Sequence, residues 1–427
     1  MLAAVLFILF AVLLLIGAPI AVCLGASSVV TMIVQGGEKP LETVMSSLPM
    51  IVSASTSKFV LLAIPFFILA GNIMEKAGIS EKLIKLAEAF VGHRKGGIAI
   101  VCVVVACFFA AISGSGPATV AALGVILVPA MIKSGYSPAF SAALMAASGA
   151  IGVVIPPSIT FVVYGSIADT SIGDLFISGV LPGILMGAAF CIAALLIGRK
   201  VNLKTLPRAT GKERWNAFKD AFWGLMMPVI ILGGIYGGIF TPTESAAVSA
   251  VYGLAVGIFI YRKIGLKEFW DILLDTVSTT ATIMFITAAA SLFAYVLTRA
   301  RLDVAISSAL ESATGGSTVI FFIIVNIILL IAGCFLDSTS ALYIFTPLFV
   351  PVAQALGVNP IHLGTVMIVN LAIGLFTPPV GVNLYVACNV GGVDLKQISK
   401  AIIPLLLASL IVLLLVTYIP GISLLLL

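Results

Sequence analysis

A pair of adjacent prolines inside a long apolar run is the feature that most restricts how this chain can fold. The run Ile151–Ser158 reads IGVVIPPS, and a second run, Ile373–Val380, reads IGLFTPPV 222 positions later. Proline lacks a backbone N–H, its ring clashes with the carbonyl four residues earlier, and it pushes the preceding residue away from helical angles. Each run is therefore expected to be two half-helices joined by unwound backbone.

The composition places these broken helices in a membrane. Of the 427 residues, 61% are hydrophobic and 9% are charged, and the apolar runs are continuous rather than alternating. This pattern predicts membrane-spanning helices and not a β-barrel. Unwound backbone inside a bilayer is tolerated only where it lines a cavity or binds a ligand, and in secondary transporters such breaks form cation sites. The first apolar run has no basic flank and continues into another, so we interpret it as a span and not as a cleaved signal.

The same offset relates a series of prolines and glycines, which indicates an internal repeat. The matched pairs include Pro129 with Pro351, Gly135 with Gly357, Pro138 with Pro360, and Pro182 with Pro404. We therefore predict an all-α polytopic membrane protein with three parts. These are a first repeat at 1–198, a basic cytoplasmic linker at 199–223, and a second repeat at 224–427. Each repeat is expected to contain five crossings and one re-entrant helical hairpin.

The hairpins are predicted from pairs of short apolar segments around a polar tip. Gly97–Ile112 would reach about 24 Å at 1.5 Å per residue, which is short of a hydrocarbon core about 30 Å thick. Its tip reads SGSGP, where we expect Gly116 to cap the returning helix and Pro117 to lie in its first turn. The second tip reads CFLDSTS. The predicted bounds are 97–131 and 319–352 for the hairpins, and 138–168 and 360–391 for the broken helices.

An odd number of crossings makes the two repeats inverted relative to each other, and the basic residues agree with this. If the N-terminus faces the periplasm, all but four of the 22 Lys and Arg residues lie on the cytoplasmic side, as the positive-inside rule requires. The exceptions are Lys39, Lys58, Arg299 and Arg301. Both termini are then periplasmic. We expect Gly36–Lys58 to form an interfacial helix and Glu75–Lys95 to form an amphipathic helix on the cytoplasmic surface.

Within each repeat, the hairpin tip and the Pro-Pro break are predicted to meet near the middle of the bilayer and to hold Na⁺. Hydroxyl, carbonyl and carboxylate oxygens suit this cation, and the chain lacks the His and Cys clusters that transition metals need. The predicted ligands are Ser113, Gly114, Ser115, Gly152, Ile155 and Pro156 in the first repeat, and Gly333, Asp337, Gly374, Thr377 and Val380 in the second. The alternatives are that the small residues only allow close helix packing and that Asp337 is only a solvated tip residue or a helix cap.

Polar residues around the same tips and breaks are predicted to contact a substrate. They are Ser158, Ser338, Thr339, Ser340, Asn370 and Asn383. Asn383 aligns with Phe161, so the two halves differ chemically there, which suits one organic substrate bound off the pseudo-axis. His93 and His362 lie near segment ends, and we interpret both as interfacial. The chain has no Walker A sequence and no nucleophile–base or metal constellation, so neither ATP hydrolysis nor another enzymatic activity is expected, and no nucleic acid partner is expected.

One further stretch is distinctive, Gly237–Ala247, which reads GGIFTPTESAA and is followed by Tyr252. Thr241 or Thr243 together with Glu244 is typical of a cap that begins a helix. Together with the tip SGSGPATVAALG and the runs IPPS and TPPVGVN, this stretch resembles the large membrane subunit of TRAP (tripartite ATP-independent periplasmic) transporters. The resemblance covers essentially the whole chain.

The resemblance implies an importer of an organic acid in the bacterial inner membrane, driven by two or more Na⁺ and working by an elevator mechanism. It also implies two protein partners, a small four-helix membrane subunit and a periplasmic substrate-binding protein, and we expect a one-to-one heterodimer with the small subunit. The substrate stays open between sialic acid and a C4-dicarboxylate, because the binding protein largely sets specificity in such systems. The alternative function is a stand-alone Na⁺/dicarboxylate symporter of the divalent-anion transporter fold.

Overall fold

The computed structural model describes residues 2–38, 40–199 and 201–427, and within these ranges the chain is helical without strands. Lys39 and Lys200, which enter the charge count above, lie outside the described residues. The helices of the first half are α1 Leu2–Leu15, α2 Ile20–Gly36, α3 Leu41–Met45, α4 Leu48–Thr56, α5 Ala63–Lys76, α6 Ile79–Val91, α7 Gly97–Ser113, α8 Gly116–Ser134, α9 Pro138–Ala150, α10 Ile159–Ala168 and α11 Ile172–Gly198. Two 3₁₀ segments accompany them, η1 Phe59–Leu62 and η2 Ile151–Val153.

The second half has a similar sequence of long and broken helices. They are α12 Gly211–Tyr236, α13 Pro242–Ala255, α14 Leu266–Arg299, α15 Leu302–Thr314, α16 Thr318–Gly333, α17 Ser338–Ala355, α18 Pro360–Gly374, α19 Val382–Gly391, α20 Leu395–Ala401, α21 Ile403–Tyr418 and α22 Gly421–Leu424. A π-helical turn, η3 Val256–Ile260, follows α13. As the TPTE sequence indicates, Thr241 and Glu244 form a capping box that begins α13.

Both Pro-Pro pairs interrupt helical hydrogen bonding. In the first half α9 ends at Ala150, η2 adds one turn, and α10 begins only at Ile159. In the second half α18 ends at Gly374 and α19 begins at Val382. The Pro156-Pro157 and Pro378-Pro379 peptide bonds are both cis. Each proline pair therefore lies in a non-helical link between two short helices.

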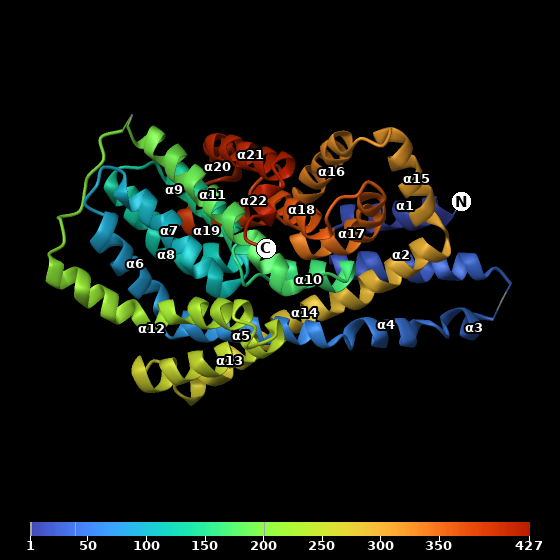
Figure 1. The fold of residues 1–427 in the computed structure, drawn as a ribbon, viewed down its shortest axis with the longest axis horizontal. Helices are drawn as coiled ribbons and strands as arrows, with labels where there is room; N and C mark the ends of the chain where they lie inside the picture. The colour runs from blue at the N-terminus through green and yellow to red at the C-terminus, as the bar shows by residue number, and fades with distance from the viewer. Residues whose placement is uncertain (1, 39, 200) are drawn as a thin grey trace.

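The two helical hairpins lie toward opposite ends of the long axis of the molecule (Figure 1). The first is formed by α7 and α8, and the second by α16 and α17, with their polar tips toward the middle. The prediction that Gly116 caps the returning helix is wrong: Ser115, in an extended conformation, holds that position, and Gly116 and Pro117 begin α8. Proline fits there because the first helical N–H groups have no partner within the helix.

Six described helices are long and apolar enough to cross a membrane, or seven if the bent pair α20–α21 counts as one span. One of the six is α8, whose 19 residues extend beyond the predicted end of the hairpin at position 131. Eight shorter apolar helices include the hairpin helices α7 and α16 and the halves of the broken helices. Length and composition alone do not separate a full crossing from a hairpin arm.

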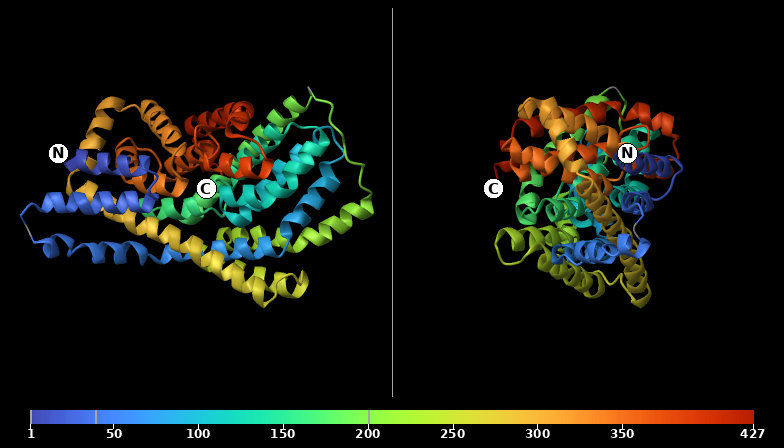
Figure 2. Two further views of the ribbon diagram at one scale, coloured as in Figure 1. Left: turned by 180° about the vertical axis from the view of Figure 1, so that it is seen from behind. Right: turned by 90° about the vertical axis from the view of Figure 1, so that its right-hand side faces the viewer.

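A group of long helices runs along one side of the molecule. The longest, α14, has 34 residues, about 51 Å at 1.5 Å per residue, and exceeds the thickness of a hydrocarbon core. It packs against α2, α4 and α5, and α5 packs in turn against α13 (Figure 2). The segment expected to form a separate interfacial helix is instead divided into α3 and α4, and α4 continues the line of α5 along α14 (Figure 1).

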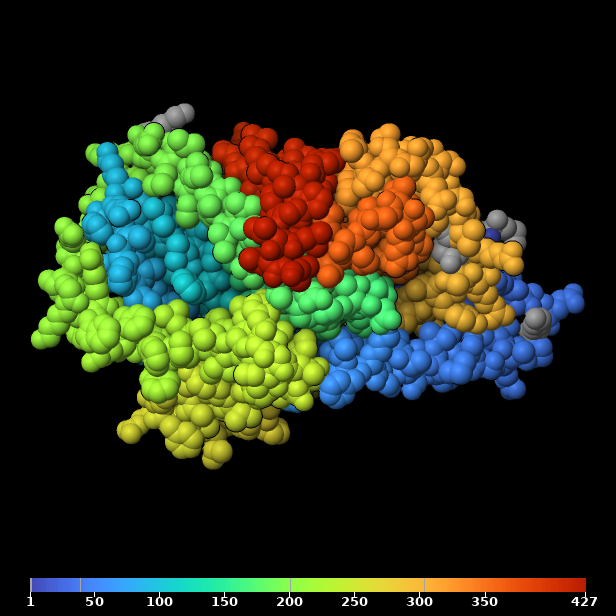
Figure 3. Space-filling view, viewed as in Figure 1, coloured from blue at the N-terminus to red at the C-terminus, as the bar shows by residue number. Residues whose placement is uncertain are grey.

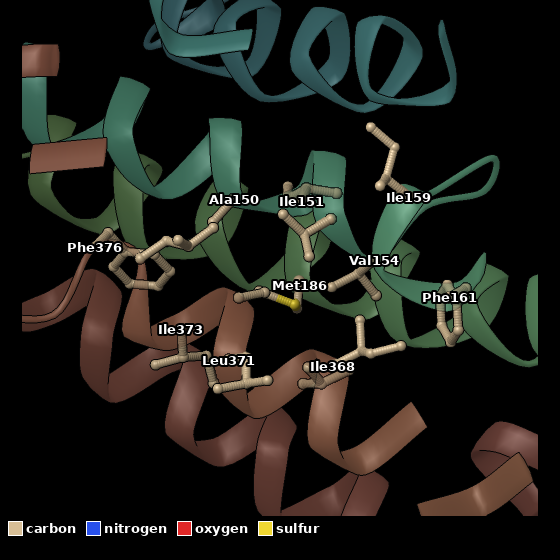
Figure 4. Packing of buried hydrophobic residues seen from close by; sticks show 14 of the residues in the cluster. Ala150, Ile151, Val154, Ile159, Phe161, Met186, Ile368, Leu371, Ile373 and Phe376 are labelled. Carbon is tan, nitrogen blue, oxygen red and sulfur yellow. The ribbon is translucent and has the colours of Figure 1, made fainter. Parts of the chain in front are cut away.

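The two breaks share one apolar core at the centre of the fold. Ile151 and Val154 of the first break face Ile368 and Ile373 of α18, with Met186 of α11 between them, and all five are fully buried (Figure 4). On the outer surface, the C-terminal segment lies between helices of the first half of the chain and the second hairpin (Figure 3). The two halves are therefore joined through their broken helices and do not form separate domains.

Candidate functional site

One cavity of about 220 Å³ brings together the tips of both hairpins. The tip of the first hairpin contributes Ser113–Ala118, and the tip of the second contributes Asp337–Thr339. Val153, Ile159 and Thr160 line it near the first break, and Leu375 and Val382 line it near the second. The long helices α5 and α14 close the remaining side. We call this space the tip cavity.

The first hairpin tip lies directly against the first break. A Cβ added at Gly152 would lie 3.3 Å from the Ser115 carbonyl oxygen and 3.2 Å from Thr119 Oγ1. A Cβ added at Gly114, which has a left-handed φ of +62°, would lie 3.1 Å from the Pro157 carbonyl oxygen. The absence of side chains at these two glycines lets the backbones of tip and break approach each other.

The second hairpin tip meets the second break even more closely. A Cβ added at Gly374 would lie 2.6 Å from Gly333 Cα and 2.8 Å from the Gly333 carbonyl oxygen, closer than real Cβ contacts occur. The Gly381 N–H donates to the Cys334 carbonyl at 3.1 Å. The predicted meeting of tip and break is thus present at the backbone level in both halves of the chain.

Asp337 combines two features that the sequence left as alternatives. Its carboxylate caps α17, because Oδ2 accepts from the Ser340 N–H at 3.1 Å and Oδ1 accepts from the Ser340 hydroxyl at 2.5 Å. The residue is only half-buried and lines the tip cavity. A carboxylate has about four acceptor sites, so the cap leaves acceptor capacity for a cation in the cavity.

The long helices supply polar residues that the sequence reasoning missed. Asn72 and Glu75 of α5 and Thr279 of α14 line the tip cavity opposite the hairpin tips. The Asn72 side-chain amide donates to Thr276 Oγ1 at 3.0 Å, which ties α5 to α14 beside the cavity. The sequence does carry a signal for Glu75, a carboxylate at the end of an apolar run. The charged stretch that follows placed Glu75 in the predicted surface helix, whereas the structure places it in α5.

The charges around the tip cavity favour cations. Among the described residues that line it, Glu75 and Asp337 are carboxylates, and none is Lys, Arg or His. Hydroxyls from Ser113, Ser115 and Thr160 add neutral oxygen donors. An organic anion entering this space would be repelled unless cations bound with it. The oxygen atoms of these carboxylates and hydroxyls are of the kind that suits a hard cation such as Na⁺.

Several predicted site residues lie outside this cavity. The hydrogen bonds that four of them make inside the helix bundle are Ser158 Oγ to the Val153 carbonyl at 2.6 Å, Ser340 Oγ to Asp337, Asn370 Nδ2 to Asn326 Oδ1 at 2.8 Å, and Asn383 Nδ2 to the Ala146 carbonyl at 3.0 Å. The predicted residues Gly152, Ile155, Pro156, Gly333, Gly374, Thr377 and Val380 also do not line it. The glycines among them contribute close backbone contacts, and Thr377 Oγ1, in the non-helical link after α18, donates to the Ile373 carbonyl of that helix at 2.7 Å.

The prediction that His362 is interfacial is wrong, because the side chain is 3% exposed within the protein. Its ring nitrogens lie 2.7 Å from Ser423 Oγ and 3.2 Å from the Thr417 carbonyl oxygen, and Phe322 packs edge-on against the ring. Because α18 is buried from His362 to its end at Gly374, the ring is enclosed by neighbouring helices. His93, by contrast, is partly exposed.

A helical membrane protein whose hairpin tips and broken helices converge on a cavity lined by carboxylates and hydroxyls is built as a secondary transporter. Comparison with known proteins defines the class further. The sequence profile of the family described as "Tripartite ATP-independent periplasmic transporter, DctM component" matches residues 7–422. The chain therefore belongs to the family of TRAP transporter large permeases, and it is a transporter subunit and not an enzyme.

Individual relatives agree with this membership. A C4-dicarboxylate TRAP transporter large permease protein from Pseudomonas aeruginosa is 46% identical over 87% of this chain and 86% of its own. A sialic acid TRAP transporter large permease protein from Vibrio cholerae is 39% identical over 86% of each. An isethionate TRAP transporter permease protein from Oleidesulfovibrio alaskensis is 44% identical over 98% of this chain, which spans 65% of that relative's length.

A solved structure shares the fold at low sequence similarity. The YdaH transporter of Alcanivorax borkumensis superposes with a TM-score of 0.63 over 98% of both chains, at 13% identity. At this identity, the likeness concerns the fold alone.

Proposed function

We propose that this chain is the permease subunit that carries an organic acid into the cell together with two or more Na⁺ ions. Relatives are named for C4-dicarboxylates, sialic acid and isethionate, all of which are organic anions. We infer a substrate of this class, of the C4-dicarboxylate or sialic acid type. The observation that carries the proposal is the tip cavity, in which both hairpin tips, both breaks and two carboxylates converge.

Charge balance gives the physical reason for coupling. An anion beside Glu75 and Asp337 is bound only when cations offset the negative charge, so the ions and the acid favour each other's binding. Ser113, Gly114 and Ser115 with the first break, and Asp337 with the second, are the oxygen donors that we assign to Na⁺. Each net positive charge imported adds about 2.3 kcal/mol of driving force per 100 mV of membrane potential.

The proposed assembly has three components. The chain forms a one-to-one heterodimer with a small four-helix membrane subunit in the bacterial inner membrane, with both termini periplasmic. A periplasmic binding protein delivers the acid. The contacts between tips and breaks support an elevator mechanism, because each hairpin lies against its broken helix at glycines and the two can therefore be carried as one body.

Uptake by the reconstituted complex tests this proposal. Proteoliposomes holding both membrane subunits are supplied with the binding protein and a panel of labelled acids that includes succinate and N-acetylneuraminate. We expect uptake that requires an inward Na⁺ gradient and increases with an inside-negative potential. Alanine at Ser113, Ser115 or Thr377 should raise the half-maximal Na⁺ concentration several-fold at normal expression.

Ser312→Ala is the matched control, because its hydroxyl, like that of Thr377, donates to the carbonyl four residues earlier, but Ser312 lies exposed on α15. It should leave the Na⁺ dependence unchanged. Uptake that depends on neither the Na⁺ gradient nor the membrane potential contradicts the proposed coupling of acid transport to Na⁺. Uptake of equal rate without the binding protein and the small subunit supports the stand-alone symporter instead.

A further inference from the structure

A second cavity lies on the same boundary between the long helices and the hairpin elements. Its volume is about 390 Å³, and it is formed by α4 and α14 on one side and by α10 and α17 on the other. The polar residues of interest are Ser55, Lys58, Thr287, Ser291, Tyr343 and Thr346. Thr287 and Ser291 lie further along α14 than Thr279 and Ile283, which line the tip cavity. We call this space the Lys58 cavity.

The two cavities carry opposite charge. Lys58 is the sole charged side chain among the described residues that line the Lys58 cavity, whereas the tip cavity has two carboxylates and no basic residue. A single positive charge between apolar walls raises the local concentration of anions. The Lys58 cavity therefore favours an anion without any accompanying cation, and the tip cavity does not.

The ammonium group of Lys58 is held in place by one hydrogen bond, which leaves its other N–H donors for a ligand. It donates to the Ser166 carbonyl at 2.5 Å, in the last turn of α10, where the helix C-terminus attracts a cation. An ammonium has three N–H donors, so two are left for a carboxylate. The bond to Ser166 holds the flexible side chain at the edge of the cavity, which reduces the entropy lost when an anion binds.

Hydroxyl groups complete the site. Thr346 is fully buried, and its Oγ1 has no hydrogen-bond partner in the described part of the chain. Thr287 Oγ1 and Tyr343 OH lie 2.8 Å apart and join α14 to α17. Because Ile283, one turn before Thr287, lines the tip cavity, this pair lies between the two cavities.

We propose that the Lys58 cavity binds the carboxylate of an organic anion before that anion reaches the tip cavity. Lys58 supplies the charge, the neighbouring hydroxyls supply neutral hydrogen bonds, and the Thr287–Tyr343 pair separates this site from the tip cavity. The order of the two sites rests on the proposed function, which places Lys58 on the periplasmic side. The anion site itself rests on the geometry and charge of the cavity.

Affinity labelling tests the site without transport. Pyridoxal 5′-phosphate is an anionic aldehyde, which condenses with a lysine amine with loss of water, and borohydride then reduces the imine to a stable secondary amine. The detergent-solubilised full chain is labelled with and without succinate or N-acetylneuraminate, and labelled lysines are mapped by mass spectrometry. We expect one of these acids to reduce labelling of Lys58 at least fivefold, while the neutral analogue succinamide does not.

Lys396, which is exposed on α20, is the reference lysine and should be labelled equally in all samples. Equal labelling of Lys58 with and without every acid, or the same protection at Lys396, overturns the proposal. This outcome is independent of uptake: a chain that transports nothing can still show protection, and a chain that transports by the proposed function can fail to show it.

Substitutions of Lys58 test whether its positive charge binds the anion, in addition to its hydrogen bond to the Ser166 carbonyl of α10. Lys58→Gln should raise the half-saturating concentration of the transported acid about tenfold and leave the half-maximal Na⁺ concentration unchanged, and Lys58→Arg should restore uptake. The control is Arg299→Gln, a basic residue near the end of α14 that contacts Tyr295 and does not line the cavity. If Arg299→Gln has the same effect as Lys58→Gln, or if Lys58→Gln changes only the maximal rate, the anion site is refuted.

Discussion

At the scale of single residues, Asp337 is the position where capping and cation binding can be separated. Asparagine caps helices as well as aspartate, so Asp337→Asn should preserve α17 while removing one of the two carboxylates of the tip cavity. We expect this variant to keep the thermal stability of the wild type and to raise the half-maximal Na⁺ concentration at least tenfold. Asp337→Ala should lose the cap as well, at about 1 kcal/mol.

The measurements are a melting curve in detergent and Na⁺-dependent uptake for both variants. Equal Na⁺ dependence of Asp337→Asn and the wild type would leave Asp337 with a capping role alone.

The residue scale also marks the limit of the sequence reasoning. Polar residues at a hairpin tip could be found because they interrupt an apolar run, and Ser113, Ser115 and Asp337 do line the cavity. Asn370 and Asn383 have the same appearance in sequence, yet they bond to neighbouring helices. Which face of a buried helix meets the cavity depends on packing between distant segments, so the sequence alone could not separate the two cases.

At the scale of elements, the contact between Gly333 and Gly374 holds the second hairpin against its broken helix. Gly374→Ala places a methyl group 2.6 Å from backbone, which cannot move aside as a side chain can. Overpacking of this kind costs about 1–3 kcal/mol. We expect a lower melting temperature and uptake reduced at least tenfold. Gly233→Ala in α12, where nothing lies within 4 Å, is the control and should be neutral or stabilising by up to about 1 kcal/mol.

A Gly374→Ala variant as active and stable as Gly233→Ala would show that tip and break need not touch. Proline chemistry let the sequence place both breaks to within a few residues, because no continuous helix accommodates two prolines there. The end of α8 was predicted too early, at position 131, although Gly135, which follows Ser134 with a left-handed φ of +110°, is a typical signal for the end of a helix.

At the scale of the whole molecule, the mobile and fixed bodies of the proposed elevator can be assigned from packing. α11 fits closely on the first break: a Cβ at Gly179 would lie 2.5 Å from the Val154 carbonyl oxygen, and one at Gly183 would lie 2.3 Å from an Ile155 side-chain carbon. It therefore belongs with the hairpins and broken helices. α14 packs on α2 and α5, α5 packs on α13, and α13 packs on α12, and these five helices form the scaffold. The sequence located the candidate spans but not these packing partners, because contacts between distant helices leave no local pattern.

Reversible crosslinks test whether these bodies move relative to each other. A Cβ at Gly173, at the start of α11, would lie 3.4 Å from Ile235 Cγ2 on α12, so cysteines at these two positions would face each other across the contact between the mobile body and the scaffold. In a background without the six native cysteines, oxidation should abolish uptake by Gly173→Cys/Ile235→Cys, and reduction should restore it.

The matched pair is Gly25→Cys/Ala289→Cys, where the two Cβ atoms would lie 3.6 Å apart between α2 and α14, both within the scaffold. A disulfide there constrains no relative movement of the two bodies, so oxidation should leave uptake within twofold of the reduced protein. Crosslinking yield is measured for both pairs by mass spectrometry, because an unformed disulfide also leaves uptake intact. If fully formed crosslinks inhibit both pairs equally, or neither, the hairpins and α11 do not move as one body against the scaffold.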